Sequence, residues 1–398
     1  MPAAEFFARE PAEVGLDPVK VQALFDRAQR EVAEGLLPSC QVAVARKGKI
    51  GAMRTFGRAV QGGAQKPATD QTLYVVFSCT KGIMASAAWL LIQEGKLDPA
   101  QRVVEYVPEF GTNGKEVVTV EQLLIHTAGF PDAPYAQEDW LDRGARLKAF
   151  AKWRLQWEPG SKYTYHPTSS FWVIAEIIER LSGMDFREFV HRKIARPLGL
   201  PDLRVGIPRD QSTRVADLVY VGEALKPEDY VRMGFPAPPE TEVTESAILG
   251  FNHPAVREAG VPGGGAVTTA ADLALFYQAL LTGGRAFDGA RIWNEDTLRD
   301  VMRVRTEGYR DPVFGNPPNR GLGVVIAGAD GMANVRGFGR TNSPAAFGHG
   351  GAGGQIGWGD PATRISLGYC TNGFDRNDIR QGRRGVAISS LAASCAAM

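Results

Sequence analysis

Strand-like segments lie near both ends of this chain, and most of the sequence between them is typical of helices. Residues 40–60, CQVAVARKGKIGAMRTFGRAV, predict two strands around a Lys-Gly-Lys turn. Three further strands are predicted over residues 321–329, 353–360 and 364–373. Strands at the two ends with helices between them favour a split architecture, in which the terminal segments share one antiparallel sheet.

The predicted fold class is therefore α/β (α+β), with an antiparallel sheet flanked by the two terminal helices and joined to an all-helical part. We expect residues 1–77 and 261–398 to form a discontinuous mixed domain. Residues 78–260 should form a mainly helical domain. Within it, residues 206–260 are proline-rich and weakly periodic, which is typical of a lid or pocket wall.

The overall composition argues against several classes of partner. The 398 residues carry a formal net charge of +1, so no nucleic acid or anionic membrane surface is expected as a partner. No apolar run approaches the roughly 20 residues needed to cross a bilayer. Glu5, Arg9, Glu10 and Glu13 interrupt the N-terminal stretch where a signal peptide needs an apolar core. We therefore expect a cytoplasmic protein, and the oligomeric state stays open.

The cysteines give no sign of a disulfide framework or a metal site. They are widely separated and show no CxxC or Cys/His ligand spacing: Cys40, Cys79, Cys370 and Cys395. Free thiols in a reducing compartment are the simplest interpretation. No zinc-type motif such as HExxH is present, so neither a metal nor another cofactor is expected.

A hydroxyl and an amine stand three residues apart where a long helix is predicted to begin. Ser78 and Lys81, in SCTKG, follow the apolar residues Val75, Val76 and Phe77. Residues i and i+3 share a helix face, so both side chains should meet on the first turn. Apolar surroundings lower the pKa of a lysine from its usual ~10.4, and a neutral amine can accept a serine proton. Alternatively, Ser78 is a helix cap beside an exposed lysine.

Four further segments follow this one in a characteristic order. They are LLIHTAGF (123–130), PGSKYTYHPTSSFWVIAEIIERLSG (159–183), GGGAVTTAADLALFYQALLTGG (263–284) and FGHGGAGGQIGWGDPATRISLGYCTNG (347–373). With SCTKG, they make the chain resemble the class C β-lactamase-like serine hydrolases over about residues 20–390. Within that superfamily, the chain is most similar to the family VIII carboxylesterases.

The resemblance implies roles for individual residues. Ser78 matches the acylated nucleophile and Lys81 its base or proton shuttle. Tyr165 matches the tyrosine of the Tyr-x-Asn motif, whose phenolate would share the proton transfers. Tyr163, two residues earlier, is the alternative for that position, although the PGxxxxY spacing favours Tyr165.

The last motif would form the other wall of the site. His349, Gly350 and Gly351 match the Lys-Thr-Gly motif of the edge strand, and the N–H groups of Ser78 and Ala352 would form the oxyanion hole.

Three more residues carry expectations about the neighbourhood of the site. Trp358 is the tryptophan that we expect to reach the cleft. His126 should hold a loop by hydrogen bonding, and whether His166 lines the pocket stays open.

Two departures from the family pattern bear on the substrate. Pro167 stands where β-lactamases have an asparagine that hydrogen-bonds the substrate amide, and His349 replaces the lysine that faces the lactam carboxylate. A neutral imidazole offers no permanent charge. The expected function is therefore a serine carboxylesterase that acts on small to medium acyl esters, with acyl transfer to alcohols as a further activity. A β-lactamase or D,D-peptidase is the alternative, and a non-catalytic binding relative is the third.

Overall fold

A seven-stranded antiparallel sheet joins the two ends of the chain, as expected. The computed structural model describes residues 1–234, 244–286 and 289–397. In spatial order the strands are β3 (Ala64–Pro67), β2 (Lys49–Gln61), β1 (Ser39–Arg46), β11 (Ile365–Thr371), β10 (Ile356–Asp360), β9 (Phe347–Gly350) and β8 (Val325–Ile326). The N-terminal and C-terminal strands meet where β1 pairs with β11, from Cys40 opposite Thr371 to Arg46 opposite Ile365.

The hairpin between β1 and β2 has the turn chemistry that its sequence predicts. Lys47 and Gly48 both adopt positive φ angles, of 55° and 82°. Two such central residues match the right-handed twist of the flanking strands, so the chain reverses within two residues.

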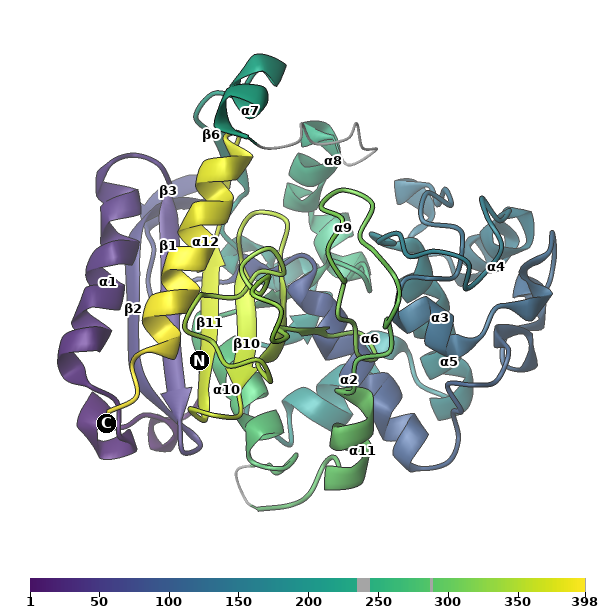
Figure 1. Cartoon of the computed structure of the whole chain (residues 1–398), viewed down its shortest axis with the longest axis horizontal. Coiled ribbons are helices and arrows are strands. Elements are labelled where there is room, and N and C mark those ends of the chain that lie inside the picture. The colour runs from purple at the N-terminus through teal and green to yellow at the C-terminus, as the bar shows by residue number, and fades with distance from the viewer. Residues whose placement is uncertain (235–243, 287–288, 398) are drawn as a thin grey trace.

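Helices cover both faces of this sheet (Figure 1). The terminal helices α1 (Pro18–Ala33) and α12 (Asp378–Ala393) pack against each other over one face, and α10 (Ala270–Leu281) packs against the other. Asp17 caps α1 by accepting hydrogen bonds from the N–H groups of Val19 and Lys20. The expected terminal helices are therefore present on the sheet.

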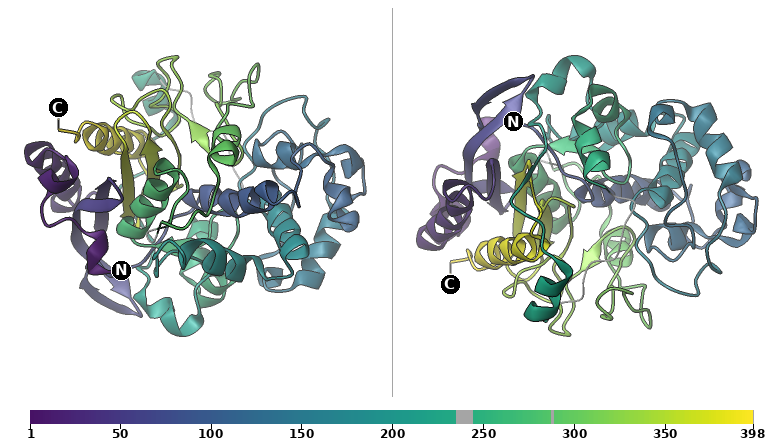
Figure 2. Two further views of the ribbon diagram at one scale, coloured as in Figure 1. Left: turned by 90° about the horizontal axis from the view of Figure 1, so that it is seen from below. Right: turned by 90° about the horizontal axis from the view of Figure 1, so that it is seen from above.

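The middle of the chain forms a helical region beside α10 and the sheet (Figure 2). Its helices are α2 (Cys79–Gln93), α3 (Val120–Leu124), α4 (Arg143–Lys152), α5 (Ser169–Ser182) and α6 (Phe186–Val190). Thr119 and Gln122 form the predicted capping box of α3. Helix α2 is buried along nearly its whole length and packs against α5. Its N-terminal turn is therefore held between the helical region and the sheet.

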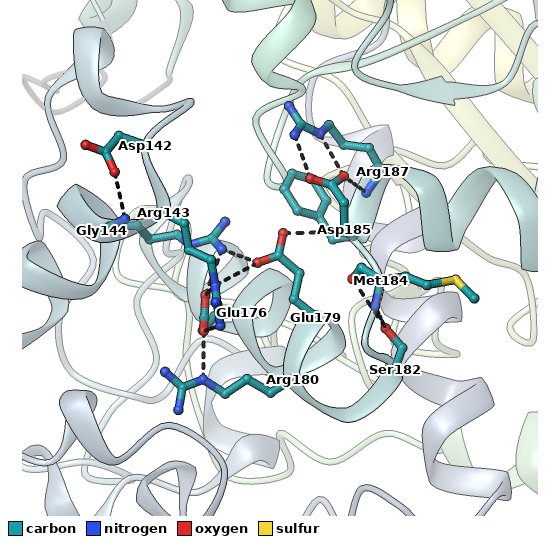
Figure 3. A network of polar contacts seen from close by, with 12 residues as sticks. Asp142, Arg143, Gly144, Glu176, Glu179, Arg180, Ser182, Met184, Asp185 and Arg187 are labelled. Carbon is teal, nitrogen blue, oxygen red and sulfur yellow. Dashed lines mark hydrogen bonds and ion pairs between the residues drawn. The ribbon is translucent and has the colours of Figure 1, made fainter.

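A buried ion-pair network fixes α4 to α5 (Figure 3). The fully buried Glu176 carboxylate accepts hydrogen bonds from Arg143, Arg146 and Arg180, and Arg146 also binds Glu179. Burial raises the pKa of Glu176, but the hydrogen bonds from Arg143 and Arg180 outweigh this effect and hold the pKa below its usual value. The network therefore ties α4 to α5 through charged side chains.

The proline-rich segment has more regular structure than its sequence indicates. Its described residues include β6 (Val219–Val221), α7 (Pro227–Met233), α8 (Glu245–Leu249) and α9 (Pro254–Ala259), and residues 235–243 lie outside the described part. Thr244 and His253 cap α8 and α9 with their side chains. These short helices escaped prediction because each is shorter than two periods of a helical pattern.

Three short strands complete the connections around α2. A small sheet joins β4 (Tyr74–Val75), β7 (Ala266–Thr268) and β5 (Arg204–Val205), while β12 (Gly373–Asp375) pairs with β6. Helix α11 (Glu295–Val301) packs against α2.

No helix among the described residues is long and apolar enough to span a bilayer. The boundaries of the two predicted domains, and the lid role of residues 206–260, remain predictions.

Candidate active site

Ser78 lies at the N-terminal end of α2, directly after β4. Its side chain makes no capping hydrogen bond to the helix, so the simple capping interpretation fails. The preceding residue, Phe77, has a φ angle of 43°, in the left-handed region that a bulky residue rarely adopts. Such strain is retained where the surrounding structure holds it, often at active sites. Here it turns the chain from strand to helix at the serine.

Lys81 is buried beside Ser78 on the first turn of α2. Its Nζ lies 3.3 Å from Ser78 Oγ, 2.6 Å from the carbonyl oxygen of Pro167 and 2.7 Å from that of Gly263. Burial and the positive charge of Arg320 lower the pKa of Lys81 well below its usual value. A neutral amine has two hydrogens and one lone pair. The two carbonyl groups take the hydrogens, so the lone pair is available to Ser78 Oγ.

The segment 159–183, which contains Tyr165, supplies another contact to Ser78. Tyr165 donates a hydrogen bond from its hydroxyl to Ser78 Oγ over 2.8 Å. Tyr163 is also buried, but its hydroxyl accepts a hydrogen bond from Arg320 Nε at 3.1 Å. The structure thus brings Tyr165, the preferred of the two tyrosines, to the nucleophile.

Burial determines the protonation state of Tyr165. Burial raises its pKa above the usual value, and the opposing effects of Arg320 and Ser78 do not cancel the increase. The phenol therefore keeps its proton in the free protein. A phenolate at Tyr165 would therefore have to form during the reaction, because the buried ring costs more to ionise than the neighbouring cation Arg320 returns. Its predicted share in the proton transfers stays a prediction.

The strand β9 ends at the opposite side of the serine. Cys79 Sγ donates to the carbonyl oxygen of His349, which ties the start of α2 to this strand. A Cβ on Gly351 would lie 2.6 Å from the carbonyl oxygen of Val76, so only glycine fits against the segment before Ser78. β9 is not the edge strand that the resemblance implies, because β8 pairs with it on the outer side. It nevertheless lies against the segment that carries the nucleophile.

The two predicted oxyanion donors have no competing acceptors. Among the described residues, the backbone N–H groups of Ser78 and Ala352 donate to no carbonyl or side chain. The loop that carries Ala352 is fixed, since Gly351 N donates to Gln355 O and the Ala352 carbonyl accepts from Gln381. Both N–H groups remain available for a developing oxyanion.

His349 is buried and neutral. Its Nε2 lies 3.1 Å from Arg320 Nη1, and its Nδ1 lies 2.8 Å from the Gly350 carbonyl oxygen. Because the guanidinium can only donate, Nε2 must accept and Nδ1 carries the proton. Burial and then Arg320 lower the pKa of His349 well below its usual value. The expectation of an uncharged imidazole here fits this geometry.

Arg320 is the functional residue that the sequence motifs missed. Its guanidinium lies 5.3 Å from the ring centre of Tyr165 and 5.8 Å from that of Tyr163, besides contacting His349. It lies outside every motif quoted above. The expectation that this wall lacks a cation is therefore wrong, because an arginine from another segment replaces the motif lysine. The Gly263 carbonyl was also missed, although it lies within a quoted motif.

The two nearby histidines have structural roles. His126 Nδ1 accepts a hydrogen bond from the backbone N–H of His166, as expected for a residue that holds a loop. His166 Nε2 accepts from Phe130 N, and its Nδ1 lies 2.7 Å from Thr164 O. Both ring nitrogens of His166 are thus occupied by backbone groups, which leaves neither for catalysis.

Trp358 does not reach the cleft, and that prediction is wrong. Its side chain is 1% exposed and donates through Nε1 to Ser389 of α12. His349 lies opposite Gly357 in the β9–β10 ladder. Since neighbouring residues of a strand point to opposite faces, Trp358 points away from His349 and into the core beneath α12.

Comparisons with known proteins identify the family of this chain. The family model described as Beta-lactamase matches residues 24–391. The esterase/beta-lactamase LipL of Mycobacterium tuberculosis is 29% identical in an alignment of 324 positions, which covers 75% of this chain and 68% of LipL.

Two solved structures are similar over nearly their whole lengths. A penicillin-binding protein homologue from Caulobacter crescentus matches with a TM-score of 0.76 and 27% identity, over 95% of this chain and 99% of that one. A family VIII carboxylesterase matches with a TM-score of 0.76 and 28% identity over the same shares. With a family model that spans most of its length and a serine, lysine and tyrosine joined at one site, this chain belongs to the beta-lactamase family of serine hydrolases.

Proposed function

We propose that the protein is a serine carboxylesterase that hydrolyses small to medium acyl esters through an acyl-serine intermediate. The observation that carries the proposal is the environment of Lys81, whose amine donates to two carbonyl groups and lies 3.3 Å from Ser78 Oγ. Burial lowers the pKa of this amine, which favours the neutral form that can accept the serine proton.

The reaction then follows from the contacts of the serine. Ser78 Oγ attacks the ester carbonyl carbon while its proton passes to Lys81 Nζ. The N–H groups of Ser78 and Ala352 stabilise the tetrahedral oxyanion. Tyr165, already a donor toward Ser78 Oγ, is placed to protonate the departing alkoxide. Water, or a second alcohol in the acyl-transfer reaction, then attacks the acyl-enzyme and gives its proton to the Tyr165 oxygen. Lys81 returns a proton to Ser78 Oγ as the acyl–serine bond breaks, which restores all three side chains.

The preference for esters over amides rests on Pro167. Proline has no side-chain amide for a substrate, and its carbonyl oxygen is occupied by Lys81. An amide substrate therefore lacks a hydrogen bond that the asparagine of β-lactamases offers. An ester needs less assistance, since its alkoxide leaves more readily than an amine.

A β-lactamase or D,D-peptidase activity is the second candidate, and Arg320 favours it. The guanidinium beside His349 offers the positive charge that a lactam carboxylate seeks. A non-catalytic role conflicts with the intact contacts among Ser78, Lys81 and Tyr165.

The experiment is a comparison of kcat/KM for nitrocefin and p-nitrophenyl butyrate on the native protein. We expect a ratio well below one. A ratio well above one would replace the esterase by the β-lactamase.

The proposal includes a cytoplasmic location. The four cysteines are buried free thiols, which suits a reducing compartment. Fractionation of the native host with activity staining tests this part, and activity confined to the cell exterior would contradict it.

A further inference from the structure

We propose that Gln355 is a positioning residue for the oxyanion hole, and that its side-chain amide holds the loop that presents the N–H group of Ala352. This inference rests on the proposed function, since it concerns the acyl-transfer step. Gln355 directly precedes β10, three residues after Ala352, and it is 0% exposed. A fully buried amide costs free energy unless it is hydrogen-bonded, so its contacts show what it holds.

Both ends of the Gln355 amide bind backbone groups. Its Oε1 accepts a hydrogen bond from Gly353 N at 3.0 Å, and its Nε2 donates to the Thr371 carbonyl oxygen at 2.9 Å. Because an N–H group can only donate and a carbonyl group can only accept, these partners fix the orientation of the amide. Thr371 is the last residue of β11, which lies in the middle of the seven-stranded sheet. The side chain therefore anchors the loop to a central strand.

The peptide unit between Ala352 and Gly353 is held at both of its ends. Its N–H group, which is that of Gly353, donates to Gln355 Oε1. Its oxygen, which is that of Ala352, accepts a hydrogen bond from Gln381 Nε2 of α12 at 2.9 Å. On the other side of the oxyanion donor, Gly351 N donates to the Gln355 carbonyl oxygen at 2.8 Å. The N–H group of Ala352 thus lies between two fixed peptide units, and it has no acceptor in the described part of the chain.

The loop passes very close to the Gln355 side chain. A Cβ on Gly351 would lie 2.6 Å from Gln355 Oε1, and a Cβ on Gly353 would lie 2.7 Å from Gln355 Nε2, so both positions require glycine. A glycine-rich backbone has many accessible conformations, and it does not fix the direction of the Ala352 N–H group by itself. A donor stabilises an oxyanion well only when it is oriented before the reaction. The Gln355 amide supplies that order.

The test replaces the Gln355 amide by a thioether of similar length. Gln355→Met removes both side-chain hydrogen bonds and frees the loop. Loss of a whole oxyanion donor lowers kcat by about 10²- to 10³-fold, and a donor that is present but poorly oriented should cost part of this, roughly 10- to 100-fold. KM should change little, because the oxyanion forms only during the reaction. The substrates are p-nitrophenyl butyrate and nitrocefin.

Gln41→Met is the matched control. Gln41 is equally buried, and its amide donates to the Thr69 and Thr72 carbonyl groups and accepts from Ala270 N, none of which belongs to the oxyanion loop. Urea unfolding should show similar losses of stability in the two variants, whereas kcat of Gln41→Met should stay close to the native value. Equal losses of kcat in both variants would mean that Gln355 only supports the fold, and would overturn the inference.

The infrared spectrum of the acyl-enzyme reports on the oxyanion hole directly. p-Nitrophenyl trimethylacetate with a ¹³C-labelled carbonyl group should leave a slowly hydrolysed acyl group on Ser78, and hydrogen bonds to the acyl oxygen lower its stretching frequency. We expect this band to move to higher wavenumber in Gln355→Met and to stay in place in Gln41→Met. An unmoved band in Gln355→Met overturns the inference. If Gln355→Met does not fold, Gln355→Asn takes its place, because the shorter amide cannot reach both Gly353 and Thr371.

The two substrates separate this inference from the esterase proposal. If the native protein turns over nitrocefin alone, the esterase proposal fails, and the variants are compared on nitrocefin, whose acyl transfer needs the same oxyanion hole. A loss of kcat specific to Gln355→Met then upholds the positioning role. If neither substrate acylates Ser78 of the native protein, no oxyanion forms there, and both proposals fail.

Discussion

Replacing Tyr165 by phenylalanine removes the hydroxyl group that we propose protonates the departing alkoxide. The lost hydroxyl donates to Ser78 Oγ over 2.8 Å, and the aromatic packing stays in place. General acid–base groups contribute about 10²- to 10⁴-fold to rate, which is about 3 to 5.5 kcal/mol of activation free energy. The loss should appear in kcat, because the proton is delivered only as the leaving group departs.

Tyr163→Phe is the matched control. It deletes the same atom from a buried tyrosine two residues away, whose hydroxyl accepts from Arg320 at 3.1 Å. It should lower stability by about 0.5–1.5 kcal/mol while kcat on ethyl butyrate, whose alkoxide needs a proton to leave, changes less than tenfold. Thermal melts check that both variants fold. A larger loss of kcat in Tyr163→Phe than in Tyr165→Phe would refute the assignment of Tyr165.

Three further predictions concern the base, the oxyanion loop and the ion-pair network. The neutral amine of Lys81 is the active form, so kcat/KM should rise as the pH passes the lowered pKa of Lys81 and should level off below about pH 10. Lys81→Arg should be nearly inactive, because a guanidinium does not give up its proton. Near-native turnover in that variant would exclude Lys81 as the base. Gly351→Ala should keep the native melting temperature within a few degrees yet lose activity, because the new Cβ would push against the Val76 carbonyl. Full activity would show that the loop at Gly351 and Ala352 does not form the oxyanion hole. Glu176→Gln should lower the free energy of unfolding in urea at pH 7 by about 1.5–3 kcal/mol, because Arg146, Arg143 and Arg180 each lose one of two carboxylate partners. The native contribution should fade only in acid, as pH falls below about 4. The exposed pair of Glu188 with Arg192 gives the control, Glu188→Gln, which should change little, and equal effects of the two substitutions would contradict this prediction.

Local patterns predicted the parts of the site that depend on short distances along the chain. Ser78 and Lys81 are one helical turn apart, so their contact follows from the helix alone. The turn at Lys47 and Gly48 and the capping box at Thr119 are local in the same sense. The pairing of the terminal strands was predicted from the order of the elements, with strands at both ends of the chain and helices between them.

The parts that failed or stayed open depend on long-range packing. Arg320 comes from a segment with no motif, 29 residues before the histidine that it contacts. Trp358 was placed by its distance along the chain from His349, whereas the strand register puts it on the other face. The protonation of Tyr165 depends on burial that only the assembled fold defines.

Covalent labelling of the active-site serine is the most direct test of whether Ser78 is the nucleophile. The protein is treated with a p-nitrophenyl phosphonate, its intact mass is measured, and tandem mass spectrometry locates the added group. Cys79 lies next in the chain, but it is buried with a pKa raised to about 12, so it should remain unlabelled. We expect one phosphonyl group on Ser78, none on Ser78→Ala, and loss of ester hydrolysis in step with labelling. Labelling on another residue, or an active and labelled Ser78→Ala, would contradict it.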